Sequence, residues 1–203
     1  MGAANWKRIG GSYRGSWSCY TSEGITLILL PKTGFNAHQI IDSNGNPFSL
    51  SDFDFVMNVN VRGSIDLVRQ CLPHMSKVTP VGEDGERGVI ILVSSSAAFD
   101  GQPGQVAYSA SKGAIVSLTL PLTRDLARYG IRVVTIAPSL FKSRMTDMMS
   151  DKVRASLTRA MEFPRRPGNA EEFAQLVRHS IENIMLNGVV LRLDGGMRMP
   201  NKL

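Results

Sequence analysis

The sequence predicts an α/β fold in which a parallel sheet is the middle of three layers. Predominantly apolar runs at residues 24–31, 89–93 and 131–137, the second without any polar residue, are typical of strands that are buried on both faces. Between these runs lie two longer segments, 52–73 and 105–128, whose apolar residues recur at helical spacing. An alternation of buried strands with amphipathic helices favours helices packed on both faces of the sheet.

Length and composition predict one domain. The chain has 203 residues, of which 43% are hydrophobic and 20% charged, enough for a core of its own. The longest apolar run is too short to cross a bilayer, so no membrane span is expected. The two cysteines and three histidines have no metal-ligand spacing, and no metal site is predicted. Half of the net charge of +6 comes from Lys7, Arg8 and Arg14, so direct binding of nucleic acid is not expected.

The first 23 residues are expected to stand apart from the domain, which is assigned to residues 24–203. Residues 1–23 are basic, rich in Gly and Ser, and free of acidic side chains until Glu23. This composition resembles a mitochondrial transit peptide, and an amino-terminal segment without a targeting role is the equal alternative. A mitochondrial location is therefore expected, with the cytoplasm as the alternative.

The first half of the domain is predicted to hold one strand and one long helix. The run at 24–31 is the strand, and the polar, turn-rich residues 35–49 form a loop. Ser51 is placed to cap a helix over residues 52–73. Seven side chains are expected to supply the apolar positions of this helix: Phe55, Val56, Val59, Val61, Ile65, Val68 and Leu72.

The middle of the domain is predicted to run from strand to helix to strand. A polar loop at 76–87 leads into the strand at 89–93. The helix at 105–128 contains Pro121, which is expected to bend it, and Gly130 ends it.

The carboxyl-terminal part is predicted to add two helices and a strand. Residues 145–161 form a Met-rich helix whose adaptable apolar surface would suit a lid over the substrate or, equally, ordinary packing. Asn169 is placed to cap a last helix that reaches residue 185. A final strand then covers residues 189–193.

Candidate catalytic residues follow the second apolar strand. A serine triplet at 94–96 comes at the carboxyl end of this strand, where open α/β sheets build their sites. Tyr108 and Lys112, spaced four apart on the next helix, project from the same face. A free phenol has a pKa of about 10, and a neighbouring ammonium is expected to lower the pKa of Tyr108 toward the range useful in acid–base catalysis. With Ser95 holding a substrate oxygen, the group predicts interconversion of a carbonyl and an alcohol with a hydride carrier.

An isolated Tyr and Lys at this spacing would more often be a surface pair, and the surrounding motifs favour the catalytic interpretation. Tyr-Ser-Ala-Ser-Lys at 108–112, after a strand that ends Val-Ser-Ser-Ser, resembles the short-chain dehydrogenase/reductase family. Segments across roughly residues 24–198 are similar to the mitochondrial type-2 3-hydroxyacyl-CoA dehydrogenases, also called 17β-hydroxysteroid dehydrogenases type 10: Ala97–Gln102, Thr119–Leu122, Arg124–Ala127, Ile136–Phe141 and Leu191–Gly195. The resemblance implies a Rossmann-type fold.

The resemblance also implies a role for each matched residue. Tyr108 is the general base, Lys112 binds the nicotinamide ribose, and Ser95 orients the substrate oxygen. Asn60 holds a water in a proton relay, with simple satisfaction of backbone groups as the alternative, and Gln105 lines the substrate pocket. The nicotinamide contacts are expected from Pro138, Leu140 and Ser143. The implied reaction is NAD-dependent oxidation of a secondary alcohol, a 3-hydroxyacyl-CoA or hydroxysteroid, in fatty acid metabolism, by a dimer or tetramer.

The amino end departs from the family pattern. Family members begin with a strand, a Gly-rich phosphate turn and a helix, whereas 23 residues are too few for the three strand–helix units expected before residue 24. Gly10 and Gly15 echo the turn, but the residues before it are polar and Trp17 stands at the third glycine position. We therefore expect a fold truncated in its amino-terminal half, with an exposed sheet edge and a weakened site for NAD. The alternative function is that of a catalytically inactive paralogue, splice form or fragment that acts as an oligomerisation or scaffold protein.

Overall fold

A computed structural model of the chain describes residues 5–7, 16–21, 24–29, 39–142 and 151–199. Within these residues the strands form one sheet in which sequence order and spatial order agree. The strands are β1 (Asn5–Lys7), β2 (Ser16–Thr21), β3 (Gly24–Leu29), β4 (Gly88–Val93), β5 (Ile131–Pro138) and β6 (Val189–Leu193).

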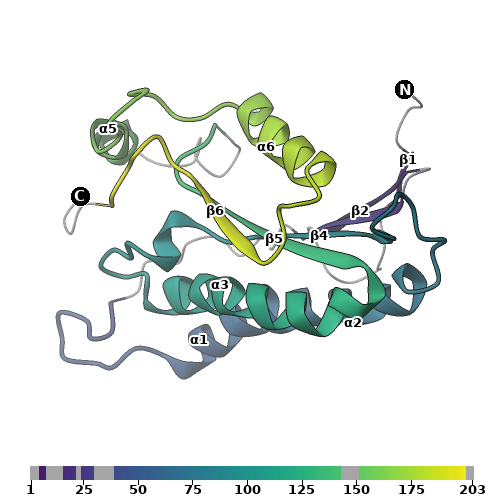
Figure 1. Cartoon of the computed structure of the whole chain (residues 1–203). Coiled ribbons are helices and arrows are strands. Elements are labelled where there is room, and N and C mark those ends of the chain that lie inside the picture. The colour runs from purple at the N-terminus through teal and green to yellow at the C-terminus, as the bar shows by residue number, and fades with distance from the viewer. Residues whose placement is uncertain (1–4, 8–15, 22–23, 30–38, 143–150, 200–203) are drawn as a thin grey trace.

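The four strands from β3 to β6 are parallel, as the apolar runs predict. Ile90 of β4 pairs with Leu27 on one side and Val133 on the other. Helices cover both faces of the sheet, so the predicted three-layer α/β fold is confirmed (Figure 1). On one side lie α1 (Leu50–Met57), α2 (Gly63–Met75) and α3 (Val106–Leu126), and on the other lie α5 (Asp151–Arg159) and α6 (Ala170–Glu182).

The amino-terminal strands correct two expectations. No apolar strand was expected before the glycine turn because residues 5–8 are polar, yet Asn5–Lys7 forms the edge strand β1, which pairs antiparallel with β2. The edge of β3 was predicted to be open, yet β2 pairs with it antiparallel from Ser16↔Leu29 to Thr21↔Gly24. Antiparallel strands at a sheet edge are held by backbone hydrogen bonds and need not be buried on both faces. Their sequences therefore need no continuous apolar run, which is why the hydrophobic pattern did not reveal these strands. Gly10 and Gly15 lie outside the described residues.

The helix predicted over residues 52–73 begins earlier and is interrupted. Ser49, not Ser51, is the residue at its amino-terminal cap, and the hydroxyls of these two serines hydrogen-bond one another at 2.7 Å. A π-helical segment, η1 (Asn58–Arg62), separates α1 from α2. Two side chains expected at apolar positions of the helix are exposed, Phe55 to 59% and Ile65 to 41%. The predicted apolar face is therefore wider than the face that packs within this chain.

The other helix boundaries agree more closely with prediction. Helix α3 runs through Pro121 to Leu126, and Gly130 follows in the left-handed conformation, with φ of 65°. Asn169 and Glu172 form a capping box at the start of α6, which ends at Glu182 rather than at 185. Helix α5 covers part of the predicted Met-rich helix, of which residues 145–150 lie outside the described part of the chain.

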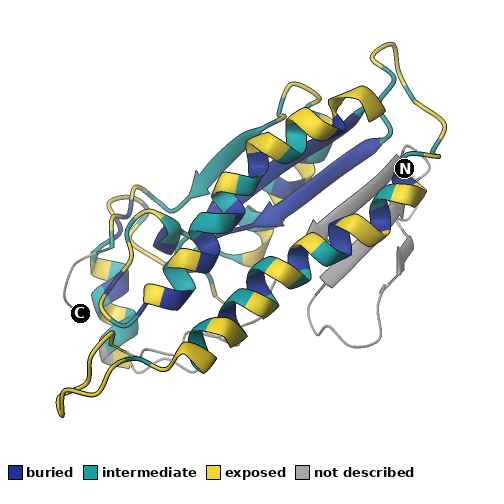
Figure 2. Ribbon diagram, turned by 90° about the horizontal axis from the view of Figure 1, so that it is seen from below, coloured by how far each residue is buried: buried dark blue, intermediate teal, exposed yellow. Residues whose placement is uncertain are grey.

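The core has one cluster on each face of the sheet and a third beyond its carboxyl edge. Figure 2 shows α2 and α3 with their buried sides toward the strands and their exposed sides outward. Among the described residues, no helix is both long and apolar enough to cross a membrane. The buried side chains are Leu67, Val68, Cys71, Met75, Ile90, Leu92, Ile115, Leu126, Ile131 and Val133 in the first cluster, Val89, Ile91, Val134, Ile136 and Val177 in the second, and Leu140, Leu157, Met161 and Met197 in the third.

Candidate active site

The serine triplet lies at the carboxyl end of β4. Ser94 is buried, and its hydroxyl donates to the backbone oxygen of Lys112 at 2.8 Å. Ser95 caps a short 3-10 helix, η2 (Ser96–Ala98), by accepting a hydrogen bond from the Ala97 amide at 3.1 Å. Ser94 thus ties the strand to α3, while the half-buried Ser95 hydroxyl faces the site.

The predicted catalytic group is brought together in space. Ser95 and Tyr108 lie close enough for the Ser95 hydroxyl to lower the pKa of the Tyr108 phenol. The ammonium nitrogen Nζ of Lys112 lies 5.6 Å from the centre of the Tyr108 ring and donates to the Val93 carbonyl at 3.0 Å. Lys112 is only 3% exposed, so a potential positive charge sits beside the phenol and away from water.

Burial dominates the titration of this pair and corrects one expectation. The pKa of Tyr108 is raised by burial, and the hydrogen bond from Ser95 offsets part of that increase. Burial lowers the pKa of Lys112 to about 8. The predicted lowering of the Tyr108 pKa by Lys112 is therefore wrong for this arrangement, because removal from water disfavours both the phenolate and the ammonium.

Asn60 is fully buried in the π-helical segment η1. Its side-chain amide donates to the Ser111 hydroxyl at 2.9 Å, and that hydroxyl donates to the Tyr108 carbonyl at 2.7 Å. The Asn60 carbonyl accepts from the Ser64 hydroxyl at 2.7 Å. Single π-helical turns inside longer helices frequently mark functional sites, because they redirect one residue and its backbone groups. Asn60 is thereby joined through Ser111 to the helix turn that carries Tyr108.

The predicted substrate residue Gln105 closes the loop that follows Ser95. Its side-chain oxygen accepts from the Gln102 amide at 2.9 Å, and its own side chain is buried. Gln105 is also the residue directly before α3, so it helps to hold the backbone where the helix that carries Tyr108 begins. This arrangement gives Gln105 a structural task, and direct contact with substrate stays a prediction.

The predicted cofactor residues lie at the carboxyl end of β5. Pro138 ends the strand, and Leu140 is buried against Leu157 and Met197. Ser139 donates its amide to the Leu193 carbonyl at 3.1 Å, while its buried hydroxyl has no hydrogen-bond partner among the described residues. Ser143 lies outside the described residues. Among the residues that the structure covers, no group of His, Cys, Asp or Glu is placed to hold a metal ion.

Two parts of the arrangement were not predicted. The first is the role of Ser111, which links Asn60 to the Tyr108 backbone. This role was missed although Ser111 lies inside the Tyr-Ser-Ala-Ser-Lys motif at 108–112. Its position three residues after Tyr108 places it one turn along α3, a signal that the sequence did carry. The second is an ion-pair network around Arg192 near Ser95, which no local pattern could reveal because its partner Asp100 lies 92 residues away in sequence.

Comparisons with known proteins identify the family of the chain. The family model described as short chain dehydrogenase matches residues 34–154. The chain belongs to the short-chain dehydrogenase family. The matched segment contains Asn60, Ser95, Tyr108 and Lys112, so family membership and the assembled site concern the same residues.

The relatives include a named enzyme. The chain is 51% identical over 151 residues to the 3-hydroxyacyl-CoA dehydrogenase type-2 of Bos taurus, covering 74% of this chain but 58% of that protein. A crystal structure of the 3-hydroxyacyl-CoA dehydrogenase type-2 from Mycobacterium avium matches with a TM-score of 0.83 at 32% identity, over 87% of this chain and 68% of that one. A 3-ketoacyl-(acyl-carrier-protein) reductase from Brucella melitensis complexed with NADH matches with a TM-score of 0.65 at 27% identity, over 85% and 67% of the chains. The chain thus spans less than two thirds of the curated relative's length.

Proposed function

We propose that the protein is an NAD-dependent oxidoreductase that interconverts a secondary alcohol and a ketone, with a 3-hydroxyacyl-CoA thioester or a hydroxysteroid as substrate. The observation that carries this proposal is the buried amine of Lys112, 5.6 Å from the centre of the Tyr108 ring, with Ser95 close enough to affect the pKa of the phenol. Hydroxyl, phenol and ammonium converge at the carboxyl edge of a parallel sheet, the edge where such folds place their ligands.

Each side chain has a distinct task in alcohol oxidation. Ser95 donates to or accepts from the substrate oxygen and holds it against the Tyr108 hydroxyl. Tyr108 removes the hydroxyl proton at its phenol oxygen, and the bound nicotinamide supplies the hydride acceptor. Lys112, whose ammonium nitrogen lies 5.6 Å from the centre of the Tyr108 ring, would bind the nicotinamide ribose. Asn60 and Ser111 hold the turn of α3 that carries Tyr108, and we propose that Asn60 also holds the water of a proton relay.

The described residues fit the nicotinamide half of the cofactor. The orphan hydroxyl of Ser139 and the adjacent Pro138 and Leu140 lie at the end of β5, and Lys112 donates to Val93 at the end of the neighbouring strand β4. We propose that these residues, with Ser143, contact the nicotinamide and its ribose. In the described residues before β4, the sheet contains antiparallel strands and no Gly-rich turn between a parallel strand and a helix, so the phosphate contacts are expected to be weak.

A direct test combines NADH binding with turnover of the full chain. Binding of NADH should raise its nicotinamide fluorescence and the unfolding temperature of the protein. Oxidation of 3-hydroxyacyl-CoA or hydroxysteroid should then produce NADH, and Tyr108→Phe should lower kcat/KM by roughly 100-fold or more, the usual share of general acid–base catalysis. A folded chain that binds no NADH and turns over no substrate would refute the enzyme and favour the scaffold alternative, whose oligomer Tyr108→Phe would leave intact.

We also propose a homo-oligomer, a dimer or tetramer, formed through the outer face of α1, α2 and α3. Phe55, Ile65 and Leu120 expose apolar side chains there, and α1 packs against α3. A groove of about 570 Å³ runs along the same face, with Arg62, Asp66 and Arg69 among its lining residues. Mixed charges beside apolar groups suit a two-fold contact in which each patch meets its own copy.

Sedimentation velocity of the double variant Phe55→Ser, Ile65→Ser should show a smaller species than the unaltered chain. Ile184→Ser, at an exposed apolar residue outside this face, is the matched control and should leave the oligomer unchanged.

For the cellular location, the basic composition of residues 1–23 supports import into mitochondria. A fluorescent fusion of the full chain should enter mitochondria, and diffuse cytoplasmic signal would contradict this.

A further inference from the structure

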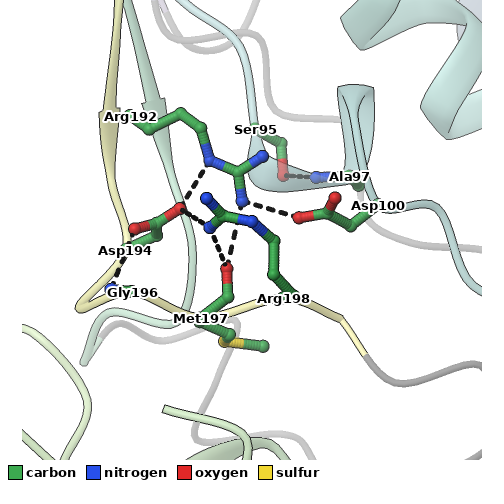
Figure 3. A network of polar contacts seen from close by, with 8 residues as sticks. All are labelled: Ser95, Ala97, Asp100, Arg192, Asp194, Gly196, Met197 and Arg198. Atoms are coloured by element: carbon green, nitrogen blue, oxygen red, sulfur yellow. Dashed lines mark hydrogen bonds and ion pairs between the residues drawn. The ribbon is translucent and has the colours of Figure 1, made fainter. Parts of the chain in front are cut away.

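Arg192 stands at the centre of a network of charges beside the proposed site (Figure 3). It lies in β6, and its Nε donates to the Asp194 carboxylate at 2.6 Å. Its Nη2 donates to the Asp100 carboxylate at 2.6 Å and to the Met197 carbonyl at 3.1 Å. Arg198 joins the same group through Asp194 and Met197. Two guanidinium groups thus meet two carboxylates, and the charges balance.

Asp100 belongs to the loop that carries Ser95. The amide of Asp100 donates to the Ser96 carbonyl at 3.0 Å, which couples the ion pair to the residue next to Ser95. The Arg192 guanidinium also lies 5.0 Å from the centre of the Phe99 ring, within the range of a cation–π contact. Arg192 therefore contacts two consecutive residues of this loop, Phe99 and Asp100.

Helix α3 fixes the opposite side of the same loop. A side-chain carbon added to Gly101 would lie 2.6 Å from the Ser109 hydroxyl, so the loop packs tightly against the residue that follows Tyr108. The loop bearing Ser95 is thus held between α3 on one side and Arg192 on the other. Its placement relative to the phenol depends on both attachments.

Arg192 also connects this loop to the proposed cofactor segment. In the sheet it pairs with Ala137, and the neighbouring Leu193 accepts a hydrogen bond from the Ser139 amide. Met197, whose carbonyl Arg192 binds, is fully buried and packs in one cluster with Leu140. The guanidinium therefore joins the loop of the substrate-orienting serine to the strand end that would contact the nicotinamide.

We propose that Arg192 is a positioning residue, whose ion pair with Asp100 holds the Ser95 hydroxyl in register with Tyr108 and with the end of β5. This inference rests on the proposed function. Arg suits the task because its planar fork binds two carboxylates at fixed angles, which a Lys ammonium cannot do. The side chains of Arg192 and Asp100 are about one-fifth exposed, at 21% and 20%, whereas the Arg178–Glu182 pair on α6 is 67% and 57% exposed. A partly buried pair holds its partners more firmly than an exposed one.

The test compares Arg192→Lys and Asp100→Asn with Arg178→Lys as the control. The first readout is the pKa of Tyr108, measured from tyrosinate absorbance of the full chain against the Tyr108→Phe version of each variant. Loss of the Ser95 interaction should raise the Tyr108 pKa in Arg192→Lys and Asp100→Asn, since that interaction lowers it. The second readout is kcat/KM, which should fall roughly 100-fold because misplaced reacting groups lose that much. Arg178→Lys should change neither value.

The outcomes separate positioning from stability. If Arg192→Lys and Asp100→Asn only lower the unfolding temperature, with the Tyr108 pKa unchanged, the ion pair is structural and the proposal is overturned. Asp100→Asn keeps the size of the side chain, so it tests the idea even where Arg192→Lys does not fold. The absorbance titration needs neither cofactor nor turnover. A chain without activity would therefore refute the proposed function, while the titration would still decide the role of Arg192 in placing Ser95.

Discussion

Replacement of Lys112 by Met should change how the stability of the protein depends on pH. Burial lowers the pKa of Lys112 from 10.5 to about 8 in the folded state. Between these values the unfolded chain binds more protons than the folded chain, so this residue makes stability rise as pH increases. The full difference corresponds to roughly 3 kcal/mol, and most of it, about 2–3 kcal/mol, should be gained between pH 7 and pH 10. Below pH 8 the folded state carries the whole cost of the buried charge.

The assay is urea unfolding followed by circular dichroism at pH 7, 8, 9 and 10. The unaltered chain should gain about 2–3 kcal/mol relative to Lys112→Met across this range. Lys77→Met is the matched control because Lys77 is exposed, and its pH dependence should follow that of the unaltered chain. Equal pH dependence in the unaltered chain and Lys112→Met would show that Lys112 is hydrated, and the reasoning from burial would be refuted.

Three further predictions concern the site and its support. Ser95→Ala should raise the Tyr108 pKa, because it removes the hydrogen bond that lowers it, and should shift the rise of the oxidation rate toward higher pH; an unchanged pH profile would contradict the contact. Asn60→Ala and Ser111→Ala should each lower kcat roughly tenfold, and the double variant should lose little more, since both belong to one hydrogen-bonded chain; additive losses would show independent roles. Gly168→Ala should destabilise the fold by roughly 1–3 kcal/mol, because the added carbon would lie 2.4 Å from the Phe141 ring, whereas Gly113→Ala meets open space and should not; a neutral Gly168→Ala in urea unfolding would refute the clash.

Local patterns predicted the features that are encoded over a few residues. The apolar runs identified β3, β4 and β5, and the four-residue spacing placed Tyr108 and Lys112 together on α3. Features set by contacts between distant segments were not predictable. Asn60 meets Ser111 across 51 residues, and Arg192 meets Asp100 across 92. The direction in which the Tyr108 pKa shifts could not be predicted either, because it depends on how deeply the folded chain buries the phenol.

The buried polar groups of the site lower the stability of the fold, which favours a catalytic role over a purely structural one. An ionised Lys112 costs the fold roughly 3 kcal/mol near neutral pH, by the same pKa difference. Among the described residues, Ser96, Ser109 and Ser139 also hold buried hydroxyls without partners, each directly after a proposed site residue. A scaffold would gain stability by replacing Lys112 with an apolar side chain, because its function would not need the charge. Lys112→Met should therefore separate the two functions: an enzyme loses turnover while its oligomer persists, and a scaffold loses nothing.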